Sequence, residues 1–354
     1  MASGLGTRFG GNKLMADFGG KPMVQWIIDL ASIMFSEVVV VTRNSGVKQL
    51  CDELNIKSVF HTLPHRSDTV RIGLKNISSN VDGCLFCLAD QPLLTYGTLY
   101  KLVSNASANP ECIWRPSCDG NVSSPIWFPC SLFSELSSLP EGKGGNVVAK
   151  RHEDIVRTIS VANPIELQDI DTKGAYDTLL PYILPSKVLS DYQASGKKHL
   201  LFTGKRGSGK TTTLRKIISL IGGENLPAIT SWAVPGKAVY LNYNLTNITY
   251  TIGEFDPVFF EENHIMVPVM EELEKVASEV LSSMADEDSS TVVIDEIGYL
   301  ESSCEIYSES LDKIIGQKRL IASVRKQDLP ILRKVITNPD AYVVDMDELT
   351  HLRF

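Results

Sequence analysis

Residues 1–21 read MASGLGTRFGGNKLMADFGGK, and this stretch sets the expected fold of the amino-terminal half. It carries six glycines and three basic side chains but a single acid, Asp17. Glycine has no Cβ and adopts positive φ readily, so such a loop can turn successive backbone N–H groups toward an anion. The stretch therefore predicts a polyphosphate-binding loop rather than a plain flexible turn, with candidate contacts at Gly4, Gly6, Arg8, Lys13 and Lys21.

An alternation of helix and strand patterns follows this loop. Residues 22–35 begin with proline and place apolar side chains at helical spacing, and EVVVVT at 37–42 is typical of a strand buried on both faces. Such alternation predicts an α/β fold with a doubly wound, Rossmann-like, mostly parallel sheet. The later elements are expected as helices near 47–54 and 67–77 and strands near 57–60 and 84–88.

One acidic residue stands where the last of these strands ends. The apolar run at 84–88 stops at Ala89, Asp90, Gln91 and Pro92. Ligands in doubly wound sheets lie beyond the carboxyl ends of the strands. Asp90 is therefore a candidate ligand for Mg²⁺ on a bound triphosphate, and the cap of the next helix is the structural alternative.

The motifs GLGTRFGGNK, GGKP and LADQP resemble the molybdenum cofactor nucleotidyltransferases of the MobA/MocA-like type, above all the cytidylyltransferase branch and its molybdenum-hydroxylase accessory relatives. The resemblance covers about residues 1–180 and includes SDTVRIGL at 67–74, LPEGKGG at 139–145 and DIDT at 169–172. It implies transfer of CMP from CTP to the terminal phosphate of molybdopterin cofactor, with release of pyrophosphate. Residues Ser67, Asp68 and Thr69 would then border the base.

Two departures from the family pattern matter. The family has a hydrophobic strand before its glycine loop, whereas here the loop begins at Met1, which suggests either an upstream start or a lost strand. Many relatives carry Gly-Asp where this chain has Gly142 and Lys143, and this lysine could contact the acceptor phosphate. Asp169 and Asp171 are then the candidates for a second metal ligand, with Asp171 preferred, and a helix-start feature is the equal structural alternative.

The second half carries its own phosphate-binding motif. A strand pattern at 199–202 leads into GKRGSGKT at 204–211, which matches Gly-x₄-Gly-Lys-Thr in full and precedes a helical pattern at 212–221. Loop amides and the helix start would cradle phosphates, with Lys210 on the β- and γ-phosphates and Thr211 on Mg²⁺. The predicted nucleotide contacts are Gly204, Gly207, Gly209, Lys210, Thr211 and Thr212.

An acidic pair at 295–296 completes this second site. TVVIDE at 291–296 is a strand that would deliver Asp295 to Mg²⁺ and Glu296 to an attacking water. Arg325 is either a γ-phosphate contact or a surface arginine, and residues 266–281 are expected to form a solvated amphipathic helix. FTGKRGSGKTT and VVIDEIGYLES resemble the small nucleoside-triphosphatases first described in thermophiles.

Length and charge bound the remaining possibilities. The 354 residues are expected to form a transferase domain (1–183), a linker (184–197) and a P-loop NTPase domain of α/β class (198–354). The net charge of −8 argues against a nucleic-acid partner, and no apolar run suits a membrane span or a secretory leader. The seven scattered cysteines, including Cys84 and Cys87, fit buried thiols in a reducing cytoplasm better than disulfides or zinc.

The sequence thus predicts an Mg²⁺-dependent cofactor nucleotidyltransferase that uses CTP, fused to a domain that hydrolyses ATP or GTP. A molybdopterin-type cofactor is the expected acceptor, and a molybdenum hydroxylase apoenzyme is a possible partner. Two alternatives stay open: transfer to a sugar or polyol phosphate, and a non-catalytic molybdenum cofactor chaperone.

Overall fold

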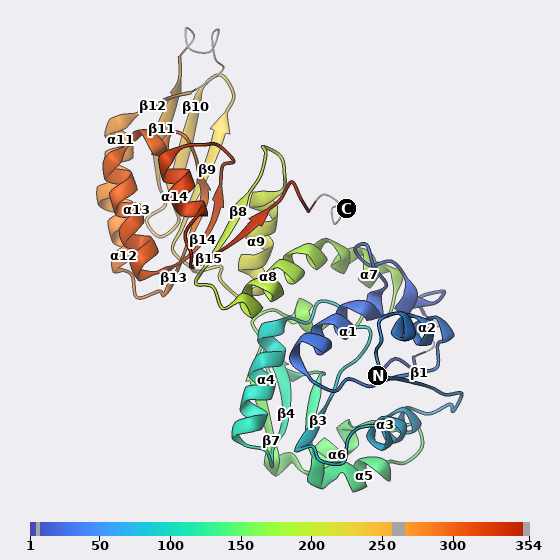
Figure 1. The fold of residues 1–354 in the computed structure, drawn as a ribbon. Coiled ribbons are helices and arrows are strands. Elements are labelled where there is room, and N and C mark those ends of the chain that lie inside the picture. Colours follow the sequence, from blue (N-terminus) through green and yellow to red (C-terminus); the bar gives the residue numbers. More distant parts are fainter. Residues whose placement is uncertain (5–7, 257–265, 350–354) are drawn as a thin grey trace. The chain divides into compact units, whose positions relative to one another are not determined.

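The computed structural model describes residues 1–4, 8–256 and 266–349 (Figure 1). The described residues up to Ala194 form one compact unit and those from Ser195 form a second. The division falls within the segment predicted as the linker. Both units combine helices and sheets, so the predicted α/β class is confirmed.

Unit 1 contains two sheets. Strands β1 (Val40–Thr42) and β2 (Ser58–Phe60) pair in parallel, and the other sheet runs β3-β6-β4-β5, with β7 beside β4. The remaining strands are β3 (Gly83–Phe86), β4 (Ile113–Cys118), β5 (Asn121–Val122), β6 (Ile126–Pro129) and β7 (Val156–Ser160). The helices are α1 (Met23–Met34), α2 (Ser45–Glu53), α3 (Arg66–Lys75), α4 (Tyr96–Ala108), α5 (Phe133–Ser137), α6 (Asn146–Arg151), α7 (Lys173–Leu179) and α8 (Ile183–Ser195), with a 3₁₀ turn η1 (Lys13–Met15) after the glycine loop.

The strand pairing of unit 1 is more mixed than the sequence predicts. Strand β6 is antiparallel to both β3 and β4, and β5 is antiparallel to β4. Only the β1–β2 and β4–β7 pairs are parallel. The prediction of a mostly parallel sheet is therefore wrong for this unit, because β6 runs against its neighbours and no described strand lies between β1 and β3 along their length.

Met1 and Ala2 bridge these two strand edges. The Ala2 N–H donates to the Val41 carbonyl (2.9 Å), and the Ala89 N–H donates to the Met1 carbonyl (3.1 Å). The α-ammonium of Met1 donates to the Cys87 carbonyl at 2.8 Å, and burial lowers its pKa. The first two residues therefore occupy a strand position between β1 and the segment after β3.

A cavity of about 450 Å³ continues from this strand position. It is lined by residues 38–41 on one side and 83–87 on the other, with apolar side chains of α1 beneath. Val38, Val39 and the residues of β3 are consequently half-buried, although the sequence predicts strands buried on both faces. Burial raises the pKa of Cys84 to about 12 and that of Cys87 to about 11, as expected of unreactive thiols.

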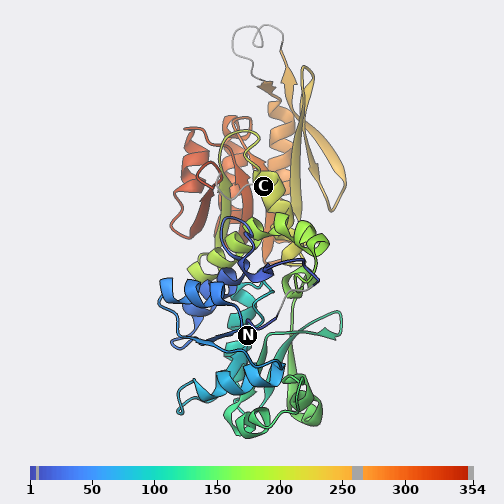
Figure 2. The same cartoon turned by 90° about the vertical axis from the view of Figure 1, so that its right-hand side faces the viewer.

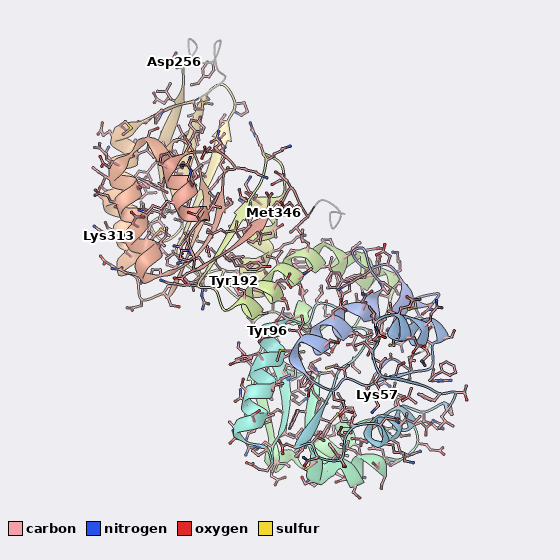
Figure 3. The ribbon with its side chains drawn as sticks, in the orientation of Figure 1. Lys57, Tyr96, Tyr192, Asp256, Lys313 and Met346 are labelled. Atoms are coloured by element: carbon pink, nitrogen blue, oxygen red, sulfur yellow. The ribbon has the colours of Figure 1, made fainter. Side chains whose placement is uncertain are left out.

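The segment predicted as the linker is largely the helix α8, which belongs to unit 1. The Ser186 Oγ donates to the Leu93 carbonyl (2.7 Å), and Ser190 Oγ and Gln193 Oε1 accept the N–H groups of Tyr96 and Gly97. These bonds hold α8 against the start of α4, and Figure 3 labels Tyr192 of α8 close to Tyr96. Prolines and serines at 181–190 made this segment resemble a connection, but Pro185 is tolerated in the first turn of the helix.

Unit 2 is one eight-stranded sheet in the order β12-β11-β10-β9-β13-β14-β8-β15 (Figures 1 and 2). Strands β9, β13, β14, β8 and β15 are parallel neighbours, and β10 to β12 extend the sheet in antiparallel fashion. The strands are β8 (His199–Thr203), β9 (Ala228–Val234), β10 (Ala238–Tyr243), β11 (Ile248–Phe255), β12 (Met266–Pro268), β13 (Thr291–Ile297), β14 (Arg319–Val324) and β15 (Ala341–Asp345).

Helices cover both faces of this sheet. Figure 1 shows α11 to α13 on one side and α9 on the other. Inward side chains of α11 to α14 share a core with β13 and β14. The helices are α9 (Lys210–Leu220), α11 (Met270–Lys275), a π-helical turn (Val276–Leu281), α12 (Ser282–Asp286), α13 (Glu305–Gln317) and α14 (Pro330–Ile336). The predicted helix at 266–281 thus begins too early, because Met266–Pro268 pairs with β11. Within the described ranges, no helix is long and apolar enough to cross a bilayer.

Candidate functional sites

The site in unit 1 is a cavity of about 390 Å³ beside the glycine loop. Asp90 enters it from the chain after β3, and Asp169 and Asp171 enter from the segment before α7. Gly4 of the loop also lines the cavity. Backbone bonding fixes this meeting of distant segments, because the Ile170 N–H donates to the Asp90 carbonyl (2.9 Å).

Lys13 links two of these three carboxylates. Its side chain is only 5% exposed, and its Nζ donates to Asp90 Oδ2 at 2.7 Å and to Asp171 Oδ1 at 2.6 Å. Burial alone would lower the pKa of Lys13, but the hydrogen bonds to Asp171 and Asp90 outweigh it and raise the pKa. The hydrogen bond from Lys13 lowers the pKa of Asp171. A buried lysine thus holds two carboxylates from opposite halves of unit 1.

Asp169 is the third carboxylate of the group. Loss of surrounding water raises its pKa to about 6, and the negative charges of Asp90 and Asp171 add to that effect. Lys13 opposes it but does not cancel it. Lys13 alone therefore does not offset the repulsion among these three carboxylates, and a cation bound beside them would be stabilised.

A divalent cation fits this donor set. The Lys13 ammonium already stands between Asp90 and Asp171, where charge compensation is required. In the part of the chain that the structure describes, no three His, Cys, Asp or Glu side chains form a ready ligand cluster. Mg²⁺ binds through one or two carboxylates together with substrate phosphates, so two carboxylates are enough.

The structure places the other loop residues differently. Arg8 is exposed and close enough for its charge to lower the pKa of Asp171 further. Lys21 does not line the cavity; it pairs with Asp29 and stacks over the Trp26 ring at 3.8 Å. Gly6 lies outside the described residues. Of the predicted loop contacts, Gly4 and Lys13 are thus brought to the acidic group, and Lys21 is held elsewhere by its own helix.

The segment predicted to border the base splits into two roles. Thr69 lines the cavity, whereas Ser67 is buried without lining it. Asp68 accepts the His65 N–H (3.0 Å) and an Arg71 hydrogen bond (3.1 Å), so it caps the first turn of α3. Lys143 is exposed and outside the cavity lining, although Gly144 and Gly145 beside it belong to that lining.

Three arginines in the cavity were missed by the motif analysis. Arg43 follows β1, Arg66 begins α3, and Arg115 lies in β4, where its Nε donates to the Ser123 carbonyl (3.3 Å). Burial lowers the pKa of Arg115, which nonetheless stays charged. An arginine inside the apolar strand IWRPSC was the one sequence clue to Arg115. All three arginines thus line the same cavity as the three carboxylates, and the charge of Arg66 lowers the pKa of Asp171.

The site in unit 2 is built on the loop between β8 and α9. Gly204, Gly207 and Gly209 all have positive φ, and a Cβ on Gly204 would lie 2.8 Å from Ser208 Oγ. Lys210 is 7% exposed, and its Nζ donates to the carbonyls of Gly204 (3.0 Å) and Lys205 (3.2 Å). The lysine therefore folds back over the loop carbonyls, and its predicted contact with the β- and γ-phosphates stays a prediction.

The acidic pair of β13 lies against this loop. Asp295 Oδ1 accepts from Thr211 Oγ1 at 2.9 Å and from Ser323 Oγ at 2.7 Å. Glu296 Oε1 accepts from Arg325 Nε at 3.0 Å. These contacts bring the predicted Mg²⁺ ligands Thr211 and Asp295 together, and their metal binding stays a prediction. Arg325 is an ion-pair partner of Glu296 rather than an isolated surface side chain.

One orphaned polar atom marks the same loop. Ser208 Oγ is buried and has no hydrogen-bond partner among the described atoms. A bound phosphate oxygen would supply that partner. Thr212 is exposed at the start of α9, where it is available at the entrance of the loop. The unpaired hydroxyl is an observation of this structure that fits a phosphate ligand.

Family comparisons agree with both sites. Residues 1–156 match the MobA-like NTP transferase domain, and residues 199–351 match the NTPase family. The chain joins a MobA-like NTP transferase domain to an NTPase domain. Both halves therefore belong to families of nucleotide-processing enzymes, and the resemblance read from the two sets of motifs is confirmed.

Individual relatives are distant. The bifunctional protein GlmU of Pseudothermotoga lettingae is 27% identical over 126 residues, which are 34% of this chain and 26% of GlmU. The chain thus spans about a quarter of that curated relative. The crystal structure of Rv0371c from Mycobacterium tuberculosis H37Rv has 23% identity and a TM-score of 0.46, covering 51% of this chain and 94% of that one. THEP1 of the hyperthermophile Aquifex aeolicus has 18% identity and a TM-score of 0.30, covering 42% and 89%.

Proposed function

We propose that the transferase domain moves CMP from CTP to the terminal phosphate of a molybdopterin-type cofactor and releases pyrophosphate. The observation that carries a transfer reaction is the bridge from Lys13 to Asp90 and Asp171, which line the unit 1 cavity. The MobA-like family of residues 1–156 and the motif resemblance support the molybdopterin acceptor and CTP as the specific substrates.

In this proposal an oxygen of the acceptor phosphate forms a bond to the α-phosphorus of the nucleotide. The bond from that phosphorus to the bridging oxygen breaks, and pyrophosphate leaves. Both reactants are anions, so catalysis consists mainly of positioning and charge neutralisation. Asp90 and Asp171 would hold Mg²⁺, which lowers the charge on the phosphates when it is bound.

The residues of the chain divide the remaining work. Lys13 fixes the two carboxylates through its hydrogen bonds, and Gly4, which lines the cavity, would let backbone approach the phosphates. The three arginines Arg43, Arg66 and Arg115 would receive the phosphate of the acceptor or of the nucleotide. If the ion pairs of Lys13 only stabilised the fold, there would be no need for these three arginines to line the same cavity.

We further propose that the NTPase domain hydrolyses ATP or GTP. Lys210 would turn from the loop carbonyls to the β- and γ-phosphates, and Thr211 and Asp295 would hold Mg²⁺. Glu296, oriented by Arg325, would accept the proton of the attacking water. Delivery of the finished cofactor to a molybdenum hydroxylase apoenzyme is the proposed use of that energy.

Product analysis tests the transfer reaction. The full chain is incubated with Mg²⁺, molybdopterin cofactor and each of CTP, GTP, ATP and UTP, and products are identified by mass spectrometry. The expected product is the cytidine dinucleotide of the cofactor with an equal amount of pyrophosphate. Pyrophosphate release only with a sugar or polyol phosphate would overturn the acceptor. Tight cofactor binding with no product from any nucleotide would favour the chaperone alternative.

A further inference from the structure

A second hollow in unit 2 opens directly beside the phosphate-binding loop. Its volume is about 560 Å³, and Arg206 of the loop and Glu296 of the acidic pair both line it. Hydrolysis needs space for one attacking water, whose share of liquid volume is roughly 30 Å³. A hollow of this size is instead in the range of small-molecule sites. The reaction with water leaves it unexplained.

Two arginines line this hollow. Among the described residues Arg206 has no ion-pair or hydrogen-bond partner, and it extends from the loop that would hold the triphosphate. Arg325 also lines the hollow, with its Nε on Glu296 and its guanidinium 5.4 Å from the centre of the Tyr299 ring. Only Nε is used in that ion pair, so the outer N–H groups are left to face an anion. These two guanidinium groups suit a phosphate group.

Aromatic side chains line the same hollow. Trp232 is 44% exposed, and its ring stacks on Tyr240 with centroids 5.7 Å apart and an interplanar angle of 28°. The two residues are direct partners on β9 and β10, so the sheet holds the indole in place. Phe255 of β11 lines the same hollow. A fixed, half-exposed indole and two arginines in one hollow suit a ligand that has both a planar ring and an anionic group.

We propose that this hollow binds a nucleoside monophosphate and that the NTPase domain transfers the γ-phosphoryl group to it. An oxygen of the monophosphate forms a bond to the γ-phosphorus of the NTP held by the loop. The bond from γ-phosphorus to the β,γ-bridging oxygen breaks, and its electron pair leaves with the nucleoside diphosphate. The acceptor oxygen is already anionic, so no proton has to be removed, and two nucleoside diphosphates are formed.

This inference rests on the proposed binding of an NTP by Lys210, Thr211 and Asp295. It differs from hydrolysis in what receives the phosphoryl group. Glu296 remains the residue that orients water when the hollow is empty, and Arg325 neutralises it when an anionic acceptor lies beside it. Water and monophosphate would therefore compete for the same γ-phosphorus.

Label transfer tests the inference on the full chain. The protein is incubated with Mg²⁺, ATP labelled in the γ-phosphate and each of AMP, CMP, GMP and UMP, and labelled products are separated. We expect labelled nucleoside diphosphate with at least one of the four, and release of inorganic phosphate that falls as that monophosphate is added. Labelled inorganic phosphate alone, unchanged by all four, would overturn the phosphoryl transfer and leave the NTPase proposal standing. No labelled product of either kind would overturn both.

Three variants locate the acceptor. Arg206→Ala and Trp232→Ala are expected to lower the ratio of labelled diphosphate to inorganic phosphate at least tenfold, and Trp232→Phe is expected to restore most of it. Arg215→Ala is the matched control, because Arg215 is exposed on α9 and does not line the hollow. A ratio that is equal in wild type, Arg206→Ala and Trp232→Ala would show that the acceptor does not bind in this hollow.

Discussion

The lysines of the two candidate phosphate sites have different hydrogen-bond partners. In unit 1, the ammonium of Lys13 bridges the carboxylates of Asp90 and Asp171. In unit 2, the ammonium of Lys210 rests on the neutral carbonyls of Gly204 and Lys205. An arriving triphosphate therefore meets an ammonium that is paired with two carboxylates in unit 1, but an ammonium that is paired with no carboxylate among the described residues of unit 2. The comparison predicts a site that depends strongly on metal and one that depends less on it.

The largest expected effect comes from removing the Lys210 ammonium. Lys210→Ala should lower NTP hydrolysis by about 10²–10³-fold, because one preorganised charge on a transferring phosphoryl group is worth that much. Nucleotidyl transfer should be unchanged. Phosphate release and pyrophosphate release measured on the same preparation separate the two reactions. Lys313→Ala, an exposed lysine of α13 that Figure 3 labels, is the control. Equal loss of NTP hydrolysis and nucleotidyl transfer in Lys210→Ala would show that the two sites do not act independently.

Nucleotidyl transfer by the unit 1 site should fall when the carboxylate of Asp90 is removed. Asp90→Ala should reduce transfer by about 10²-fold or more, since it removes a proposed Mg²⁺ ligand and leaves buried Lys13 with one partner. NTP hydrolysis should be retained. Asp154→Ala, an exposed acid of the same unit, serves as the matched variant in the product assay. Product formation at the wild-type rate in Asp90→Ala would show that this carboxylate holds no metal.

Metal removal sharpens the contrast between the two lysines. With Mg²⁺ chelated, nucleotide affinity should fall more in the Lys210→Ala protein, where only unit 1 binds, than in the Asp90→Ala protein. The reason is that three carboxylates line the cavity in unit 1, whereas two acids contact the loop in unit 2. Asp295 accepts from Thr211 Oγ1, and Asp347 accepts the Lys205 N–H (3.1 Å). Equilibrium binding of a nonhydrolysable NTP with and without chelator measures both. Equal losses would contradict the electrostatic difference.

A buried acid next to the unit 2 hollow gives a pH test. Glu301 is 3% exposed and accepts the Gly298 N–H (2.9 Å); burial raises its pKa to about 7, with Glu296 raising it and Arg325 lowering it. The folded state then binds the proton more tightly than the unfolded state, so stability is full below about pH 4.5 and falls as the pH rises toward 7. Glu301→Gln should therefore stabilise unit 2 by roughly 3 kcal/mol at pH 8 and by less than about 1 kcal/mol at pH 5.

Unfolding of unit 2 can be followed separately through Cys304. This residue is buried in unit 2, and the other six cysteines belong to unit 1. Urea-dependent labelling of Cys304, resolved by mass spectrometry, measures the free energy at both pH values. A gain of equal size at pH 5 and pH 8 would show that ionisation of Glu301 is not its cause.

The smallest expected effect concerns the strand position before Met1. A short apolar, β-branched extension should pair with β1 and β3 across the 450 Å³ cavity and remove the buried α-ammonium. We expect it to stabilise unit 1 by about 1–3 kcal/mol, the amount typical of burying one large apolar side chain. A glycine-serine extension of equal length is the control, and urea-dependent labelling of the buried Cys51 is the measurement. No difference between the two extensions would show that this cavity does not accept a strand.

Sequence reasoning succeeded best where chemistry and backbone are fixed by one short motif. The loop at 204–211 and the acids at 295–296 lie together as predicted, because a parallel sheet brings the carboxyl ends of β8 and β13 to one edge. In unit 1 the motif could indicate Asp90 but not its ion pair with Lys13. Lys13 lies 77 residues from Asp90 and 158 residues from Asp171 along the sequence, and only the folded chain shows that the three side chains meet.

The misplaced predictions share a physical cause. Lys21 belongs to the glycine-rich motif, yet Asp29 and Trp26 one to two turns along α1 hold it locally. The prolines of α8 suggested a loop, although hydrogen bonds to α4 stabilise a helix there. Arg206 and Trp232 matched no catalytic pattern, because a hollow is formed by strands that meet only in the sheet. Local spacing predicts elements, whereas tertiary neighbours decide which side chains reach a site.

Nucleotide stoichiometry tests the central claim of two independent polyphosphate sites most directly. Native mass spectrometry of the full chain with excess Mg²⁺ and nonhydrolysable CTP and ATP analogues counts the bound molecules. The account predicts two nucleotides per chain for the wild type and one for Lys210→Ala. A single nucleotide on the wild type, or two on Lys210→Ala, would contradict it.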